Sequence, residues 1–232
     1  MHLSIILPVL NEDKNLSRTL KSLQSYRKQG HEIIVVDGRS EDTSMDIARA
    51  LADHTLQTNP GRARQMNAGA AIATGDLLLF LHADTRLPGT AIDQIQALFD
   101  KQQSAANLWG RFDVRLSSDK IIFRVVEKLI NLRSRLFSIA TGDQAIFIQA
   151  SLFRRINGFP EIDLMEDIAI SRRLRRHTSA ACLSAQVITS SRRWEKQGVI
   201  ATIVLMWKLR LLYFIGISPS RLAKMYYPEK FS

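Results

Sequence analysis

Three short apolar runs in the first 84 residues each lead into an acidic or amide side chain. Leu3–Leu7 is followed by Asn11-Glu12, Glu32–Val36 by Asp37, and Leu77–Leu81 by Asp84. Such runs are typical of buried parallel strands, and open α/β sheets bind ligands where these strands end. A lone carboxylate at such a position is as well explained by capping a turn. Three together favour one ligand-binding crevice.

Asp84 is the candidate metal ligand of this crevice. Its carboxylate is a hard oxygen donor of the kind that holds Mg²⁺ or Mn²⁺ against a diphosphate. His82 stands two residues earlier. It could ligate the same ion, hydrogen-bond a phosphate, or do neither.

A second acidic pair, Glu166-Asp167, opens a predicted helix, Glu166–His177. The helix dipole stabilises charged carboxylates at this end, and such a carboxylate is a simple general base. Dipole complementation without catalysis is the alternative for both residues.

The predicted elements form a mixed sheet that is parallel in its first half, with helices on both faces. Asn11 is the expected N-cap of the first helix. Further expected helices and strands are Ser44–Asp53, Thr55–Gln57, Arg62–Ala73, Gly89–Lys101, Ala106–Leu116, Lys120–Phe137, Ala145–Ile148 and Ala180–Leu183. A chain of 232 residues fits a single domain.

Charge is unevenly distributed along the chain. Residues 1–100 hold 10 Lys/Arg and 12 Asp/Glu, whereas residues 101–232 hold 22 and 10. The excess of cations in residues 101–232 predicts a partner with an anionic surface. No nucleic-acid-binding motif is present, so we do not expect that partner to be a nucleic acid. The single cysteine, Cys182, excludes a disulfide framework, and its place in the predicted buried strand Ala180–Leu183 predicts a core thiol rather than a nucleophile. With no signal peptide visible, we expect a cytoplasmic protein.

Several motifs resemble glycosyltransferase family 2, and they occur in that family's order. They are Ser4–Glu12 (SIILPVLNE), Val35–Ser40 (VVDGRS), Gly61–Gly69 (GRARQMNAG), His82-Ala83-Asp84, Met165-Glu166-Asp167 and Ser191–Trp194 (SRRW). The resemblance covers nearly the whole chain up to Trp194, and the nearest branch is the small bacterial enzymes of arsenosugar-biosynthesis type. In two places the chain departs from the pattern: Gly38 replaces the second acid of a usual pair, and His82 replaces the first Asp of the Asp-x-Asp motif.

The resemblance implies a three-layer α/β/α nucleotide-diphospho-sugar transferase (GT-A) fold and a metal-dependent, inverting, hexosyltransferase-like enzyme. The donor would be a UDP- or GDP-linked sugar, with Asp84 and tentatively His82 on the metal. Asp167, or Glu166 beside it, would be the base. The implied nucleotide-sugar-binding residues are Pro8, Leu10, Asn11, Glu12, Asp37, Gly61, Arg62, Asn67, Ala83 and Asp143. For Asp143, closing a turn with Gly142 is an equal alternative.

The implied organisation is a nucleotide-binding half (1–100), an acceptor and catalytic half (101–196) and a C-terminal helical segment (197–232). A non-catalytic nucleotide-sugar or anion-binding module, attached to a membrane or not, is the alternative function. No residue pattern specifies the acceptor.

The apolar stretch Val199–Ile217 approaches the length of a bilayer span, but Lys208 and Arg210 lie near its centre. Each costs about 2.5–3.5 kcal/mol at the middle of a bilayer, which disfavours a span. The alternatives are peripheral contact with the membrane face, burial in a homodimer, and a core helix of the domain. Lys208, Arg210, Arg221 and Lys224 are the expected contacts with anionic lipid.

Overall fold

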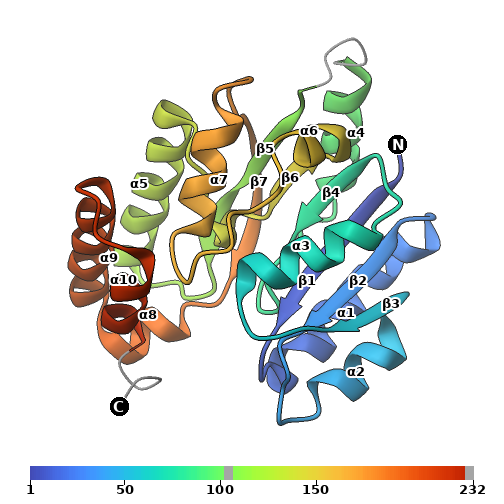
Figure 1. Cartoon of the computed structure of the whole chain (residues 1–232), viewed down its shortest axis with the longest axis horizontal. Helices are drawn as coiled ribbons and strands as arrows, with labels where there is room; N and C mark the ends of the chain where they lie inside the picture. Colours follow the sequence, from blue (N-terminus) through green and yellow to red (C-terminus); the bar gives the residue numbers. More distant parts are fainter. Residues whose placement is uncertain (102–106, 228–232) are drawn as a thin grey trace.

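The computed structural model describes residues 1–101 and 107–227 of the chain (Figure 1). The first residue of the predicted strand Ala106–Leu116 and the end of the predicted C-terminal segment lie outside the described residues.

One sheet of seven strands runs through the molecule in the order β3-β2-β1-β4-β6-β5-β7. The strands are β1 Leu3–Val9, β2 Glu32–Asp37, β3 His54–Gln57, β4 Leu77–Phe80, β5 Trp109–Leu116, β6 Ile146–Gln149 and β7 Ala181–Thr189. Strands β1 to β4 pair in parallel, and β6 runs antiparallel to both β4 and β5. The predicted mixed sheet with a parallel first half is therefore confirmed.

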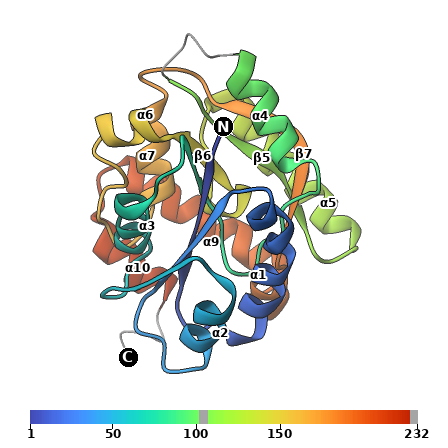
Figure 2. The ribbon, with the colours of Figure 1, turned by 90° about the vertical axis from the view of Figure 1, so that its right-hand side faces the viewer.

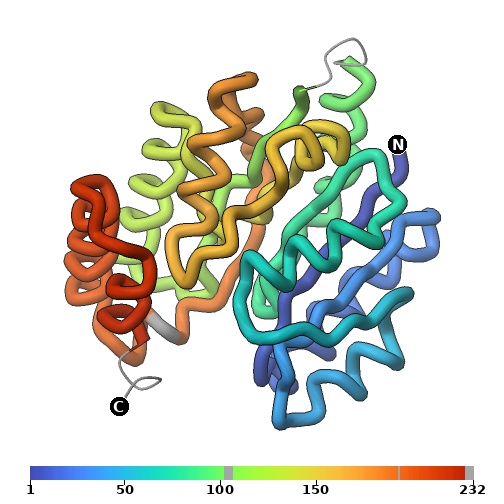
Figure 3. Tube along the Cα trace, viewed as in Figure 1, coloured from blue at the N-terminus to red at the C-terminus, as the bar shows by residue number. Residues whose placement is uncertain are grey.

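Helices cover both faces of the sheet. They are α1 Asp13–Lys28, α2 Ser44–Leu51, α3 Arg62–Ile72, α4 Ala91–Lys101, α5 Ile121–Phe137, α6 Ala150–Arg155, α7 Glu166–Leu174, α8 Arg192–Gln197, α9 Val199–Phe214 and α10 Pro219–Tyr226, with a 3₁₀ turn at Gly142–Gln144. Figure 2 shows α3, α6 and α7 on one side and α1, α4 and α5 on the other. The first hundred residues occupy one side of the molecule in Figure 3, and α8 to α10 lie at the opposite end.

The apolar runs of the sequence arise because the central strands are buried on both faces. In β1, Leu3, Ile5 and Leu7 pack into the core beneath α1 and α4, whereas Ile6 packs into the core beneath α3 and α6. Strands covered on both sides need apolar residues at every position rather than at alternate ones.

Two local expectations are corrected by the structure. Asn11 is not the N-cap of the first helix: it lies in the left-handed region (φ 54°), its amide oxygen accepts from the Glu41 N–H at 2.9 Å, and α1 begins at Asp13. Cys182 is only partly buried, because β7 lies at the edge of the sheet and leaves one side of the strand uncovered.

The ends of β1 and β2 are joined by the buried side chain of Gln65 on α3. Its Nε2 donates to the carbonyl oxygens of Val9 and Val36, each at 2.8 Å. This contact fixes the spacing of the two strand ends that lead into the loops around Asn11 and Asp37.

We expect Gln65→Leu to lower the free energy of unfolding by about 1–3 kcal/mol, because buried carbonyl groups lose a donor. Urea denaturation measures this, with Gln29→Leu at an exposed position as the control. Equal effects of the two substitutions would contradict the role given to Gln65.

Candidate functional site

Carboxyl groups from both halves of the chain interact electrostatically at the site where the sequence predicts a crevice. Glu12 at the end of β1 interacts with Asp84 beyond β4, and Asp84 interacts with Asp143 in the 3₁₀ turn. Asp143 in turn interacts with Asp167 at the start of α7, where Glu166 is the neighbouring acid. The two acidic segments that the sequence singled out therefore belong to one site.

The backbone around this crevice departs from ordinary conformations. Asn11, Ala145 and Met165 all have positive φ angles, at 54°, 49° and 71°. A non-glycine residue in this region carries a strain of roughly 1–2 kcal/mol. Met165 immediately precedes α7, so its conformation sets the direction in which Glu166 and Asp167 leave the chain. Strain of this kind clusters at functional sites.

His82 is neutral at physiological pH and packs against the 3₁₀ turn. A Cβ atom on Gly142 would lie only 2.4 Å from the His82 Nε2, so the imidazole occupies the space left by the missing side chain. Burial, aided by the Arg62 cation, lowers the pKa of His82 to about 3. The ring therefore reaches the turn that holds Asp143 in a form that can accept a hydrogen bond or ligate a metal.

Asp84, two residues after His82, is half-buried. Burial raises the pKa of its carboxyl, and the cations Arg62 and Arg192 oppose the rise. Among the described residues no group of three His, Cys, Asp or Glu side chains could hold a metal ion by itself. One carboxylate fits Mg²⁺ or Mn²⁺ all the same, because such ions are commonly held by one or two carboxylates together with substrate phosphates and water.

Asp167 is oriented by two backbone donors. Its Oδ2 accepts from the Gly142 N–H at 3.2 Å and its Oδ1 from the Ile168 N–H at 2.7 Å. Glu166 is more deeply buried, with 8% of its surface exposed. Burial raises the pKa of both carboxyls, and the Asp167 charge raises that of Glu166 further. Half-buried acids with raised pKa values are typical of groups that accept a proton.

Arg62 supplies the opposing charge. Partial desolvation disfavours its cation, but Tyr227, Glu166, Tyr226 and Asp167 outweigh that effect and hold the pKa of Arg62 above its usual range. The side chain remains exposed to solvent. Arg62 also lies within electrostatic reach of the catalytic candidates Glu166 and Asp167, and its expected contact with the nucleoside stays a prediction.

Two predicted nucleotide-sugar residues are engaged within the protein. Asp37 is fully buried, and it accepts from the N–H and hydroxyl of Ser40 and, at 3.3 Å, from Gln57. Asn67 exchanges two 2.9 Å hydrogen bonds with the backbone of Phe159, 92 residues away. Both side chains shape the loops around the crevice, and their contact with a nucleotide stays a prediction.

The other predicted binding positions form the strand ends and the start of α3. Pro8 and Leu10 are half-buried around the end of β1. The buried Ala83 accepts a 2.6 Å hydrogen bond from the Thr19 hydroxyl. Gly61 precedes α3 with a φ of 146°, a conformation that L side chains rarely adopt.

Further basic and aromatic residues lie at the site, and the sequence analysis gave none of them a role in binding the donor or in catalysis. They are Arg133 on α5, Arg192 on α8, Arg210 on α9, and Tyr226 and Tyr227 at the end of α10. Arg210 interacts with Asp167 and Asp143, which makes it a candidate site residue; its expected contact with lipid stays a prediction. A buried cation in an apolar helix requires a partner of opposite charge. The position of Arg210 inside the apolar stretch Val199–Ile217 could therefore have indicated that it pairs with acidic residues.

Arg133 is the least satisfied member of this group. Its Nε and Nη2 atoms are buried and have no hydrogen-bond partner within the described part of the chain. Desolvation lowers the pKa of Arg133 to about 10, reinforced by the like charge of Arg210 and opposed by Asp143 and Asp167. The carboxyl cluster is thus bordered by cations contributed by α5 and α9.

Comparison with known proteins identifies the family. Residues 4–155, well over half of the chain, match the family described as "Glycosyl transferase family 2". The chain belongs to glycosyltransferase family 2. A "PGL/p-HBAD biosynthesis glycosyltransferase" of Mycobacterium bovis is 30% identical over 164 residues, covering 67% of this chain and 62% of that protein. An uncharacterised glycosyltransferase of Nostoc is 29% identical over 129 residues, covering 53% and 40%.

Solved structures show that this family 2 glycosyltransferase has the GT-A fold. TarS of S. aureus (residues 1–349) superposes with a TM-score of 0.67 at 21% identity, covering 82% of this chain and 61% of that one. The mannosyltransferase PcManGT of Pyrobaculum calidifontis, solved with GDP-Man and Mn²⁺, gives 0.60 at 20% identity and covers 81% and 56%. The family 2 chain spans roughly 40–60% of the length of these proteins.

We expect Glu166→Gln to stabilise this glycosyltransferase increasingly as pH rises. An unfolded glutamate ionises above about pH 4.3, whereas the buried side chain keeps its proton to higher pH. The free energy of unfolding of the wild type therefore falls as pH rises from about 4.3 to the raised pKa of Glu166 in the folded protein. Glutamine does not ionise, so the variant lacks this decline. Thermal unfolding between pH 4 and 8 measures the effect, with the exposed Glu41→Gln as the control. A difference in Tm that stays flat or shrinks with pH would contradict the burial of a charge at Glu166.

Proposed function

We propose that this family 2 glycosyltransferase moves a hexosyl group from a nucleotide diphosphate sugar to an acceptor hydroxyl with inversion. The observation that carries the proposal is the continuous run of interacting carboxyls from Glu12 and Asp84 through Asp143 to Asp167. This arrangement supports the pairing of a candidate metal ligand, Asp84, with a candidate base, Asp167, at one site.

The donor side of the crevice belongs to residues 1–100 in this proposal, and residues 101–196 supply the base and the acceptor side. Asn11, Glu12, Asp37 and Arg62 would face the nucleoside and ribose. Structural neighbours were solved with UDP-GlcNAc and with GDP-Man, which supports a UDP- or GDP-linked donor. Residues 197–232 join the site through Arg210 and the tyrosines that follow it.

Asp84 would hold a divalent metal ion, Mg²⁺ or Mn²⁺, with the donor's phosphate oxygens completing the coordination. Such an ion, when bound, neutralises charge on the leaving diphosphate. The Mn²⁺ in the PcManGT complex supports the choice of metal. His82 is adjacent, but its packing against Gly142 equally suits a neutral hydrogen-bonding partner of the donor.

Asp167 would act as the general base in a direct displacement. The acceptor oxygen bonds to the anomeric carbon as the bond from that carbon to the phosphate oxygen breaks. The electron pair leaves with the nucleoside diphosphate, and the hydroxyl proton passes to Asp167. The two backbone N–H groups leave further lone pairs on this carboxylate. Glu166, which is more buried and whose pKa is raised by burial and by the Asp167 charge, would position Arg62.

A nucleotide-sugar-binding module without catalysis is the alternative. The burial of a second acidic pair with raised pKa values favours the enzyme, because a binder needs no base. The partly exposed single thiol of Cys182 supports a reducing, cytoplasmic setting as part of the same proposal.

We expect Asp167→Asn to lower kcat by at least 100-fold and to change donor affinity less than threefold, because the carboxylate acts on the acceptor proton. A panel of UDP and GDP sugars with Mn²⁺ identifies the donor first, and Asp46→Asn at an exposed position is the control. Activity within a few-fold of wild type would remove Asp167 as the base. Binding without transfer or hydrolysis in the wild type would favour the binding module.

We expect Asp84→Asn to abolish the dependence of donor binding on Mn²⁺, because an amide is a far weaker ligand for this ion than a carboxylate. Calorimetric titration of the donor with and without Mn²⁺ measures this. An unchanged increase in affinity on adding Mn²⁺ would place the ion elsewhere.

A further inference from the structure

Helix α9 exposes an apolar stripe on the side that faces away from the protein. Its inner side packs Leu209 against Leu164 and Ile168 at the start of α7. The outer stripe follows helical spacing and consists of Ile200, Val204, Trp207, Leu211 and Phe214, all more than half exposed. A helix that is apolar all round is normally covered on every side.

Helix α5 carries a second exposed stripe. Phe123 and Val126 face inward and meet Val199 and Ile203 of α9, which places the two helices side by side (Figure 1). The outward residues of α5 are Ile121, Ile122, Val125, Leu129, Leu132 and Leu136, with exposed fractions from 42% to 82%. Apolar surface on this scale marks a contact site for a membrane or another protein.

The charges around the two stripes are mainly positive, although the exposed Asp119 precedes α5, where it pairs with Arg115, and the exposed Glu195 precedes α9. Lys128, Lys208 and Arg221 are exposed on α5, α9 and α10. The one carboxylate of these three helices, Glu127, is 6% exposed and bonded to the Leu116 N–H and to Arg124. An apolar surface flanked by an excess of cations is complementary to an anionic lipid surface.

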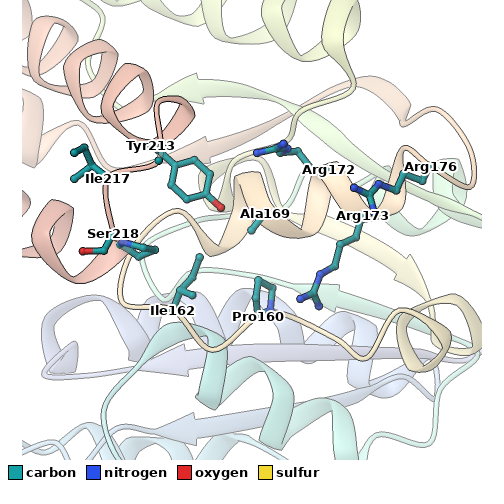
Figure 4. Close-up of a pocket in the computed structure, with 11 residues that line it drawn as sticks. Pro160, Ile162, Ala169, Arg172, Arg173, Arg176, Tyr213, Ile217 and Ser218 are labelled. Carbon is teal, nitrogen blue, oxygen red and sulfur yellow. The ribbon is translucent and has the colours of Figure 1, made fainter.

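A hollow of about 440 Å³ adjoins the end of the α9 stripe (Figure 4). It lies beside the last turns of α7, away from the acids at the start of that helix. Tyr213 lines one wall, and Arg172 and Arg176 line another. The Arg172 guanidinium also lies 5.8 Å from the ring centre of Phe214, the last residue of the stripe. The arginines therefore stand where a lipid headgroup would lie if acyl chains contacted the stripe.

We propose that the α5 and α9 stripes form a docking face for an anionic membrane surface, with Arg172 and Arg176 receiving lipid phosphate groups. The contact lies along the bilayer surface; no helix within residues 1–101 or 107–227 is long and apolar enough to cross a membrane. A second copy of the chain fits less well, because a two-fold interface brings identical patches together and would oppose like cations. The face is formed without Asp84, Glu166 or Asp167, so its test does not depend on the proposed reaction.

The test is flotation of the full chain with vesicles of neutral phosphatidylcholine, or of phosphatidylcholine with 30% phosphatidylglycerol. We expect the protein to float with the anionic vesicles at low salt, and far less with the neutral ones or at 0.5 M salt, because exposed charges are screened. Trp207→Glu and Leu129→Glu should each reduce the bound fraction at least tenfold. Ile72→Glu, at an exposed apolar position on α3, is the matched control and should leave binding unchanged.

Milder substitutions keep the test valid if a glutamate variant misfolds. Lys208→Gln should weaken binding about fivefold, the equivalent of ~1 kcal/mol for a cation near an anionic surface. The double variant Arg172→Gln/Arg176→Gln should reduce the preference for anionic over neutral vesicles. Protein that stays in the soluble fraction at low salt would overturn the proposal, as would a dimer mass that is lost in Trp207→Glu. Flotation that none of these substitutions weakens would also overturn it.

Discussion

Five carboxyl groups share one partly desolvated crevice, and the rest of the site follows from how their charge is balanced. Glu12, Asp84, Asp143, Glu166 and Asp167 come from four separate segments of the chain. Gathering them raises the pKa values of Glu12, Asp84, Glu166 and Asp167 through burial and mutual repulsion. Arg62 lies within electrostatic reach of Glu12, Asp84, Glu166 and Asp167 and is the cation on which that balance depends most.

The same balance explains why the C-terminal helices belong to the site. Helix α9 directs Arg210 toward Asp143 and Asp167, and α10 ends in two tyrosines near Arg62. These contacts connect the crevice to the helix that carries the exposed apolar stripe. Docking of that stripe on a membrane would bring the helix that carries Arg210 to the lipid surface. A bound anion beside Arg133 would also satisfy donors that lack a partner among the described residues.

The fold was predictable because its signals are local. Apolar runs predicted the central strands correctly. The acidic groups at the carboxyl ends of β1, β2 and β4 indicated that the site lies where these strands end. Asn11 misled because its amide bonds to the backbone of Glu41, thirty residues away, rather than to its own helix. Asp37 and Asn67 have the right residue types, but whether a side chain faces a ligand or a neighbouring loop depends on tertiary contacts. Arg133 and Arg210 were missed for a similar reason, since only the packing of α5 and α9 brings their charges to the acids.

The central claim is that Asp84 and Asp167 face one donor from opposite sides of a single crevice. A crystal structure with the donor nucleotide sugar and Mn²⁺, with the ion located by its anomalous scattering, tests it most directly. The account predicts one Mn²⁺ peak on the Asp84 carboxylate. It also predicts that the anomeric carbon lies on the Asp167 side of the diphosphate, with room for an acceptor oxygen between them. A metal peak on other residues, or a sugar turned away from Asp167, would contradict it.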